Sequence, residues 1–235
     1  MPKDSLNLAG FNEDEAENIY ENRRRFLKLF AGQWLLTGCW QTHSADIRAI
    51  RSADDAKVKP DVLGDDEYCD ALVSNTPQIF LAVKTADCVP ILLGDSTTGA
   101  FAAVHAGWRG TSASIVARTI EQLHNQYGVR VENLRVAIGP AANICCYEVG
   151  AEVIDRFKER FAETGSLFVA TRGDHARIDL PKANCEQLIR AGLSPNRIHV
   201  APFCTMDRTD LFFSYRREKS VYGRVGRLMS VIGRR

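Results

Sequence analysis

The sequence TADCVPILLGDSTTGAFAAVHAGWRGT occupies residues 85–111 and decides the central part of the fold. Its two apolar runs, Val89–Leu93 and Phe101–His105, flank a polar connector, Gly94–Gly99, and this arrangement is typical of a β-hairpin. Each run is apolar at successive positions, which indicates strands that are buried on both faces of a sheet.

The predicted hairpin brings a cysteine and a histidine together. If the strands pair symmetrically about the connector, Leu93 faces Ala100 and Cys88 faces His105. Directly opposed residues share one face with Cβ atoms roughly 5 Å apart, so a thiolate and an imidazole could share one ion there. Pro90 cannot donate a hydrogen bond to a neighbouring strand, which favours a bulge or an edge position for its strand.

The ends of these two strands carry several groups suited to chemistry. Cys88 follows Asp87, and His105 precedes the run AGWRG at residues 106–110, whose glycines let the backbone approach a ligand closely. A single cysteine or histidine at such a position is often only part of the core. Their convergence indicates a functional site, which we interpret either as a metal site or as a cysteine nucleophile with a histidine base.

The remainder of the chain mixes helices and strands without regular β-α-β alternation. Asn12 and Glu15 form a capping-box pattern that opens a helix over residues 13–31. The polar stretch 53–70 predicts a loop. Further helices are predicted over residues 112–127, 148–161 and 181–191, and further strands over 34–42, 47–50, 79–83, 134–138, 198–201, 211–215 and 228–232. We therefore expect an α/β fold of the α+β type, with a single domain over residues 1–235 and mixed β-sheets flanked by helices.

Bulk composition excludes several classes of function. The chain has 235 residues, and its 30 basic and 29 acidic residues leave a net charge of +1. That balance lacks the electrostatic attraction of proteins that bind nucleic acid or anionic membranes, so neither is an expected partner. Seven cysteines, with no C-x-x-C pair and no signal peptide, indicate reduced thiols in the cytoplasm. Nothing in the sequence indicates an oligomeric state.

The motifs TADCVPILL, VHAGWRGT, AIGPAANICCYEVG and LFFSYRR together resemble those of the bacterial laccase-domain family. The resemblance runs from DSLNL at residues 4–8 almost to the C-terminus. Members of this family were first called polyphenol oxidases and were later described as zinc-dependent purine nucleoside enzymes. The resemblance implies a metal site formed by His43, Cys88 and His105. The family usually has a strand and an Arg-x-Gly-Gly turn before the DSLNL motif, and we expect this sequence to lack them.

The resemblance also implies the substrates: phosphorolysis of adenosine, inosine and methylthioadenosine by phosphate, together with deamination of adenosine. Three protein ligands and one open position are typical of a catalytic zinc ion. Zinc lowers the pKa of a bound water towards roughly 7, which suits deamination. Phosphorolysis instead requires the phosphate to be held and oriented, a role for which arginine is suited. Arg109, four residues after His105, is the first candidate for that role.

Other substrate contacts are predicted with less direct support. If residues 211–215 form a strand, Ser214 and Arg216 lie on one face and point to the site together, and Arg217 faces the other way. Asp87 is a candidate acid/base or a group that orients a ligand imidazole. Cys146 is predicted to line the pocket, and the family resemblance makes Asn7 a substrate contact.

Three alternative functions fit parts of this pattern. Two histidines and a cysteine also form a blue-copper ligand set, so copper-dependent polyphenol oxidation is one alternative and copper an alternative metal. Multicopper laccases need His-x-His pairs, however, and none of the five histidines forms one. The second alternative is a Cys/His hydrolase acting on peptidoglycan precursors. The third is a non-catalytic module that binds a metal or a nucleoside.

Overall fold

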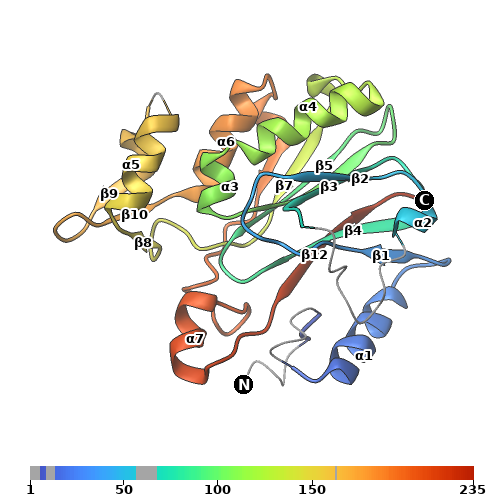
Figure 1. Ribbon diagram of the computed structural model, residues 1–235, viewed down its shortest axis with the longest axis horizontal. Helices are drawn as coiled ribbons and strands as arrows, with labels where there is room; N and C mark the ends of the chain where they lie inside the picture. The colour runs from blue at the N-terminus through green and yellow to red at the C-terminus, as the bar shows by residue number, and fades with distance from the viewer. Residues whose placement is uncertain (1–5, 9–13, 57–67, 162) are drawn as a thin grey trace.

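The computed structural model describes residues 6–8, 14–56, 68–161 and 163–235. Within these residues the main sheet has six strands in the order β11-β7-β5-β6-β3-β2 (Figure 1). The pairs β2/β3 and β7/β11 are parallel and the others are antiparallel, so the sheet is mixed. The strands are β2 (Ile47–Ile50), β3 (Ala71–Ser74), β5 (Val89–Gly94), β6 (Phe101–Ala106), β7 (Arg135–Ile138) and β11 (Ile198–Val200).

A second sheet packs against one face of the main sheet. It has the order β1-β4-β12 and consists of β1 (Leu35–Thr37), β4 (Ile79–Thr85) and β12 (Leu228–Gly233). Both β4 and β12 contact β6, whereas α4 (Ile115–Tyr127) contacts β6 and β3 from the helical layer on the other side (Figure 1). Strand β6 is covered on both faces, and every one of its residues is therefore buried.

Alternate residues of β6 belong to two different cores. Ala102 and Val104 pack into the larger core beneath the helices. Phe101 and Ala103 pack into the smaller core between the two sheets. Because side chains alternate across a strand, His105 lies on the same face as Phe101 and Ala103, towards the second sheet.

The other elements surround these two sheets. Helices α3 (Trp108–Ser112) and α6 (Leu180–Arg190) lie beside α4, and α1 (Ala16–Leu27) lies against the second sheet, where Phe26 approaches Phe80 with ring centroids 6.3 Å apart. A small sheet with the order β8-β10-β9 lies next to α5 (Figure 1). The remaining elements are α2 (Ala53–Ala56), β8 (Glu148–Val149), α5 (Ala151–Arg160), β9 (Phe168–Ala170), β10 (Ala176–Ile178), α7 (Tyr215–Tyr222) and the 3-10 turns 131–133, 165–167 and 195–197.

The predicted fold class is confirmed, but the register of the hairpin differs from the symmetric pairing. Leu93 pairs with Ala102 and Pro90 with His105, an offset of two residues. The turn causes the offset, because the Asp95 carboxylate accepts hydrogen bonds from the Thr97 amide at 2.8 Å and the Thr98 hydroxyl at 2.9 Å. An offset of two residues preserves the face of every side chain, so Cys88 and His105 still approach each other.

The predicted bulge or edge position at Pro90 was wrong. Strand β5 lies between β6 and β7, inside the sheet. Opposite Pro90, the His105 amide donates to the Asp70 carbonyl oxygen of the next segment at 2.7 Å, so the missing N–H of Pro90 is not required by β6. On its other side β5 pairs with β7 only from Ile91 onward, so Pro90 lies at the end of that pairing and the interior position is tolerated.

Several predicted boundaries also change. Residues 211–215 are not a strand, because Ser214 caps α7: its hydroxyl accepts from the Arg217 amide at 3.3 Å, and its own amide donates to Glu218 at 2.7 Å. The helix predicted from residue 112 is divided into α3 and α4 by Ser114, which has a φ of 60°. Asn12 lies outside the described residues, and Glu15 is the N-cap of α1. The helix predicted from 148 begins at 151, and the predicted loop 53–70 contains α2 at 53–56.

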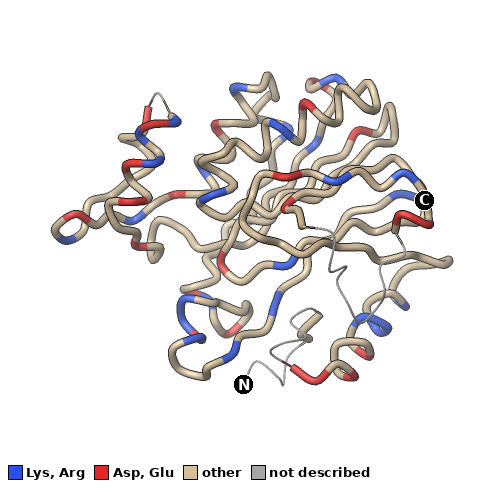
Figure 2. Tube along the Cα trace, viewed as in Figure 1, with Lys and Arg blue, Asp and Glu red and all other residues tan. Residues whose placement is uncertain are grey.

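Acidic and basic positions are interspersed along α4, α5 and α6 (Figure 2). No helix within the described ranges combines the length and the apolar character that crossing a bilayer would demand. All seven cysteines are free thiols.

Candidate metal centre

His43, Cys88 and His105 meet where the chain passes between the two sheets. The segment that joins β1 to β2 carries His43, and the turn that joins β4 to β5 carries Cys88. His105 is the penultimate residue of β6. One ligand atom from each residue lies within 4.8 Å of the others, and the two imidazole rings have centroids 4.9 Å apart. The structure thus brings together the three residues that the family resemblance implied.

Two of the turns at this centre have strained backbones. His43 has a φ of 62° and Asp87, directly before Cys88, has a φ of 89°. A non-glycine residue in such a conformation costs roughly 1–3 kcal/mol and persists only where its surroundings enforce it. The enforcement comes from two buried carboxylates, those of Asp70 and Asp87.

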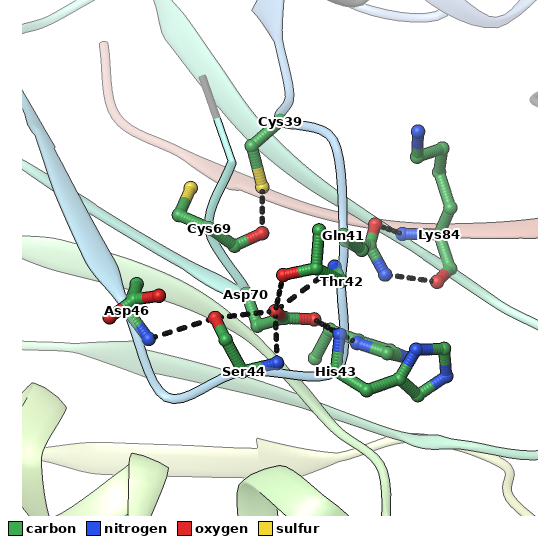
Figure 3. A network of polar contacts seen from close by, with 10 residues as sticks. Cys39, Gln41, Thr42, His43, Ser44, Asp46, Cys69, Asp70 and Lys84 are labelled. Carbon is green, nitrogen blue, oxygen red and sulfur yellow. Dashed lines mark hydrogen bonds and ion pairs between the residues drawn. The ribbon is translucent and has the colours of Figure 1, made fainter. Parts of the chain in front are cut away.

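Asp70 holds the turn that carries His43 (Figure 3). Its carboxylate accepts from the backbone amides of His43 at 3.0 Å and Ser44 at 2.7 Å, and from that of Thr42 at 3.2 Å. It also contacts Nδ1 of His105 at 2.7 Å. This contact occupies Nδ1 and leaves Nε2 of His105 for a metal, as in the carboxylate–histidine pairs that support zinc sites. The sequence contained no signal that singled out Asp70 among its acidic neighbours.

Asp87 holds the turn that carries Cys88. Its carboxylate accepts from the Thr205 hydroxyl and from the Arg216 backbone amide, both at 2.7 Å. Its carbonyl oxygen accepts from the Ala142 amide at 2.8 Å. Asp87 therefore connects three segments around the centre. The orienting contact to an imidazole that was predicted for Asp87 is made by Asp70 instead.

In the protein without metal, the pKa values of Cys88 and His105 favour a thiolate on Cys88 and a protonated imidazole on His105. Burial opposes ionisation of Cys88, but the charge of His105 and the hydrogen bonds from His105 and His43 lower the pKa of the thiol to about 6. Burial also opposes a charged His105, but the Cys88 thiolate and the Asp70 carboxylate raise the pKa of that imidazole to about 9. A metal ion that binds here therefore replaces the proton of His105 and finds the thiolate already formed.

The donor set fits a zinc ion. Two imidazoles and a thiolate are ordinary zinc ligands, and three protein ligands leave the fourth tetrahedral position open. His43 is exposed, Cys88 is half-buried and His105 is buried, so the cluster extends from the core to the surface.

Gly107 leaves the space that two of the ligands, Cys88 and His43, occupy. A Cβ atom at Gly107 would lie 3.0 Å from Sγ of Cys88 and 3.0 Å from Cδ2 of His43, so both ligands would have to move.

We expect Gly107→Ala to weaken zinc binding by about 10-fold to 100-fold, the range seen when the support of a metal ligand is lost. Competition with a chromophoric zinc chelator measures this affinity. Gly165→Ala, which adds a Cβ with no neighbour within 4 Å, is the control. Equal affinities for both variants would contradict the expectation.

The predicted arginines take different positions. Arg109 is exposed on α3, with its guanidinium 4.3 Å from the ring centroid of Trp108. Arg216 is exposed at the start of α7, where its Nη1 donates to the Glu148 carbonyl oxygen at 3.0 Å and its guanidinium lies 4.9 Å from the Tyr147 ring centroid. Strand alternation does not explain its location, because α7 begins at Tyr215. Its backbone amide nevertheless donates a hydrogen bond to the Asp87 carboxylate, which places Arg216 next to the turn that carries Cys88.

Ser214, Asn7 and Cys146 were predicted as substrate contacts. Ser214 is fully buried as the cap of α7. Asn7 is also buried, and its side chain donates to Asp14 at 3.0 Å and accepts from the Arg227 amide at 3.0 Å, so that it links the start of the described chain to the segment before β12. Cys146 is half-buried and belongs to a second cluster, with Cys145 and Cys204.

Comparison with known proteins places this centre in a family. The family model described as multi-copper polyphenol oxidoreductase laccase matches residues 1–235. A protein of Geobacillus stearothermophilus named purine nucleoside phosphorylase YlmD is 32% identical over 238 residues, covering 100% of this chain and 85% of the relative. Purine nucleoside phosphorylase YfiH of Shigella flexneri is 33% identical, covering 98% of this chain and 87% of the relative.

Solved structures agree with this placement. The crystal structure of YlmD from Geobacillus stearothermophilus superposes with a TM-score of 0.90 at 32% identity, covering 98% of this chain and 85% of that one. The structure of the Bacillus licheniformis hypothetical protein YfiH superposes with a TM-score of 0.91 at 29% identity, covering 98% and 86%. Sequence, fold and the match along the whole chain agree, and the chain belongs to the multi-copper polyphenol oxidoreductase laccase family.

Proposed function

We propose that this protein is a zinc-dependent purine nucleoside phosphorylase whose zinc is bound by His43, Cys88 and His105. The observation that carries the proposal is the cluster of two imidazoles and one thiolate, with ligand atoms within 4.8 Å of one another and an open side at the exposed His43. The relatives from Geobacillus stearothermophilus and Shigella flexneri are named purine nucleoside phosphorylase, and these names support the substrate class.

Zinc is the metal that we favour over copper. The set of two nitrogens and one sulfur suits zinc, and it also suits copper, which outcompetes zinc at many sites of this composition. An oxidase of the multicopper type would need paired His-x-His ligands, which the five histidines do not provide. Copper bound at this centre would therefore be a substitute for the native ion.

The proposed reaction breaks the bond between the base and the ribose. An oxygen of inorganic phosphate attacks C1′ of the ribose, and the purine leaves with the bonding electron pair and takes up the proton that the phosphate gives up. The products are the free base and ribose 1-phosphate. The metal, when bound, supplies a Lewis acid that stabilises charge as it develops.

The residues of this chain hold the reactants and the ligands in place. Arg109 is exposed close in sequence to His105, and we assign its guanidinium to the phosphate, for which its planar fork is suited. Arg216 is a second, weaker candidate, because one of its nitrogens is already engaged by the Glu148 carbonyl oxygen. Asp70 and Asp87 keep the two ligand-bearing turns in their strained conformations.

The experiment that tests this function is adenosine turnover with and without phosphate, in zinc-loaded protein. Phosphorolysis releases adenine and ribose 1-phosphate only when phosphate is present. Inosine formed without phosphate would instead indicate deamination, which we propose as a second activity of the same centre. Inosine and methylthioadenosine serve as further substrates in the same assay. If none of the three nucleosides is converted, the proposal is rejected.

A cysteine hydrolase is the second candidate, because the Cys88 thiolate and the His105 imidazolium would also serve as nucleophile and acid. His43 distinguishes the two functions, since a metal centre needs it as third ligand and a hydrolytic dyad does not.

We expect His43→Ala to reduce bound zinc from one equivalent to less than about 0.1, as two ligands hold zinc poorly. Elemental analysis after dialysis measures the loss. A full equivalent retained by the variant would favour the hydrolase.

We further propose that the chain acts as one domain in the cytoplasm. All seven cysteines are free, and a reducing compartment keeps thiols in that state. Purine nucleosides and phosphate are its proposed small-molecule partners.

A further inference from the structure

Three cysteines form a second cluster outside the His43–Cys88–His105 centre. The Sγ atoms of Cys145, Cys146 and Cys204 all lie within 4.8 Å of one another. Cys145 is exposed, Cys146 is half-buried and Cys204 is buried, so the cluster can be reached from solvent. None of these thiols takes part in the proposed phosphorolysis.

Backbone contacts between two distant segments assemble this cluster. Ala141 pairs with Cys204 in an isolated parallel bridge, and the Thr205 amide donates to the Ala141 carbonyl oxygen at 3.0 Å. The Asn143 amide lies 3.4 Å from Sγ of Cys204. The Asn143 carbonyl oxygen accepts from the Cys146 amide at 2.9 Å, which folds the adjacent cysteines back over Cys204. The fold thus holds the backbone of these two segments so that the three thiols lie together.

The composition of the cluster selects a particular class of ion. A set made only of thiols favours soft ions, of which Cu(I) and zinc are the common examples. Zinc in an all-protein site requires a fourth ligand. Among the residues that the structure describes, no histidine, carboxylate or further cysteine joins these three. Three sulfurs alone complete the coordination of Cu(I), which accepts a trigonal arrangement.

We propose that Cys145, Cys146 and Cys204 bind one Cu(I) ion as a three-sulfur site, separate from the zinc centre. Sulfurs around one ion at about 2.3 Å lie roughly 3.8–4.0 Å apart, so an initial separation of up to 4.8 Å requires only a modest contraction. Binding releases the three thiol protons to solvent and involves no change in oxidation state.

The surroundings favour the net negative charge that three thiolates and one Cu(I) ion would carry. Nη1 of Arg177 donates to the Cys145 carbonyl oxygen at 3.0 Å, so a guanidinium lies beside the cluster and offsets the negative charge of a Cu(I)–trithiolate unit.

The test uses full-length Cys88→Ala protein, in which the zinc centre has lost its thiolate, reduced and kept without oxygen. Titration with Cu(I) in competition with bicinchoninate is expected to reveal one tightly bound equivalent. Adding Cys145→Ser should abolish it, and this exposed change leaves the core intact. Adding Cys185→Ser, which alters a half-buried cysteine outside both clusters, should leave the equivalent in place. X-ray absorption should show copper with three sulfur neighbours.

Three results would overturn this proposal. The first is the absence of a tightly bound equivalent in Cys88→Ala, and the second is its retention after Cys145→Ser. The third is oxidation by air, in which the protein loses the mass of two hydrogen atoms and two titratable thiols of this cluster, and binds no copper after it is reduced again. This result would show that two of the cysteines form a disulfide and that the cluster is not a copper site. Because zinc and nucleosides are not part of the assay, none of these results depends on the proposed phosphorylase activity.

Discussion

Cys88→Ala is expected to lose its zinc and to release adenine from adenosine at least about 1000-fold more slowly than the wild type. Cys88 is the only thiolate of the centre, and it is the ligand whose pKa is already lowered to about 6 by its two histidine neighbours. Alanine leaves two imidazoles, of which one is exposed. A Lewis acid contributes several kcal/mol to the stabilisation of a transition state, and about 4 kcal/mol corresponds to the expected factor.

Elemental analysis and a phosphate-dependence assay on the same preparation measure both effects. Cys185→Ala provides a control, because Cys185 is also half-buried but belongs neither to the metal centre nor to the cluster of Cys145, Cys146 and Cys204. It should keep one zinc equivalent and wild-type turnover. Wild-type turnover in Cys88→Ala despite the loss of zinc would show that the metal is not required, and the proposed mechanism would then be wrong.

Asp70→Asn is expected to have the largest effect on stability, lowering the free energy of unfolding by about 3–5 kcal/mol, as in other buried ion pairs that lose one partner. The Asp70 carboxylate accepts three backbone amides and contacts the His105 imidazole. An asparagine would direct an NH2 group towards some of these donors and leave buried groups unpaired. The strained turn at His43 would also lose its restraint, so we expect zinc affinity to fall by about 10-fold to 100-fold.

Chemical denaturation and zinc competition measure the two effects of Asp70→Asn. Asp46→Asn is the matched control, because Asp46 is exposed and lies in the same network of contacts (Figure 3). Its stability should stay within about 0.5 kcal/mol of the wild type. A similar stability for both variants would show that Asp70 does not organise the centre.

The pH dependence offers an independent check on Asp70. Burial raises the pKa of this carboxyl, but His105 and Ser44 outweigh burial and lower it below its ordinary value of 3.8. A group whose pKa is lowered by folding stabilises the protein above its unfolded pKa and loses that contribution as the pH falls towards the folded value. The stability difference between wild type and Asp70→Asn should therefore be complete at neutral pH and shrink below about pH 4.

The sequence predicted the parts of the site that depend on local pattern. The apolar runs around residues 89–93 and 101–105 identified the two central strands, because burial on both faces demands apolar residues at successive positions. The proximity of Cys88 and His105 survived an error of two residues in the register, since side chains repeat their face every second residue. The family motifs added His43, which no local pattern distinguished.

The parts that were missed depend on capping and on distant contacts. The run at 211–215 has the composition of a strand, but Ser214 and Glu218 form a reciprocal cap that starts α7 instead. The orienting role was assigned to Asp87, the acidic neighbour of the ligand in sequence, whereas Asp70 contacts the imidazole from the beginning of β3. Spacing along the chain could not reveal this, because the pairing of β3 with β6 brings the two residues together.

By itself, the sequence determined the class of the fold, the central strands and the types of ligand, because hydrophobic periodicity and donor chemistry are properties of individual residues and their neighbours. The tertiary structure decided which of the many acidic and sulfur-containing residues act together. Asp70 became the support of the metal centre, and Cys204 joined Cys145 and Cys146, through contacts between segments that are far apart along the chain. The first contact depends on the pairing of β3 with β6 and the second on the bridge between Ala141 and Cys204, and no local pattern encodes either geometry.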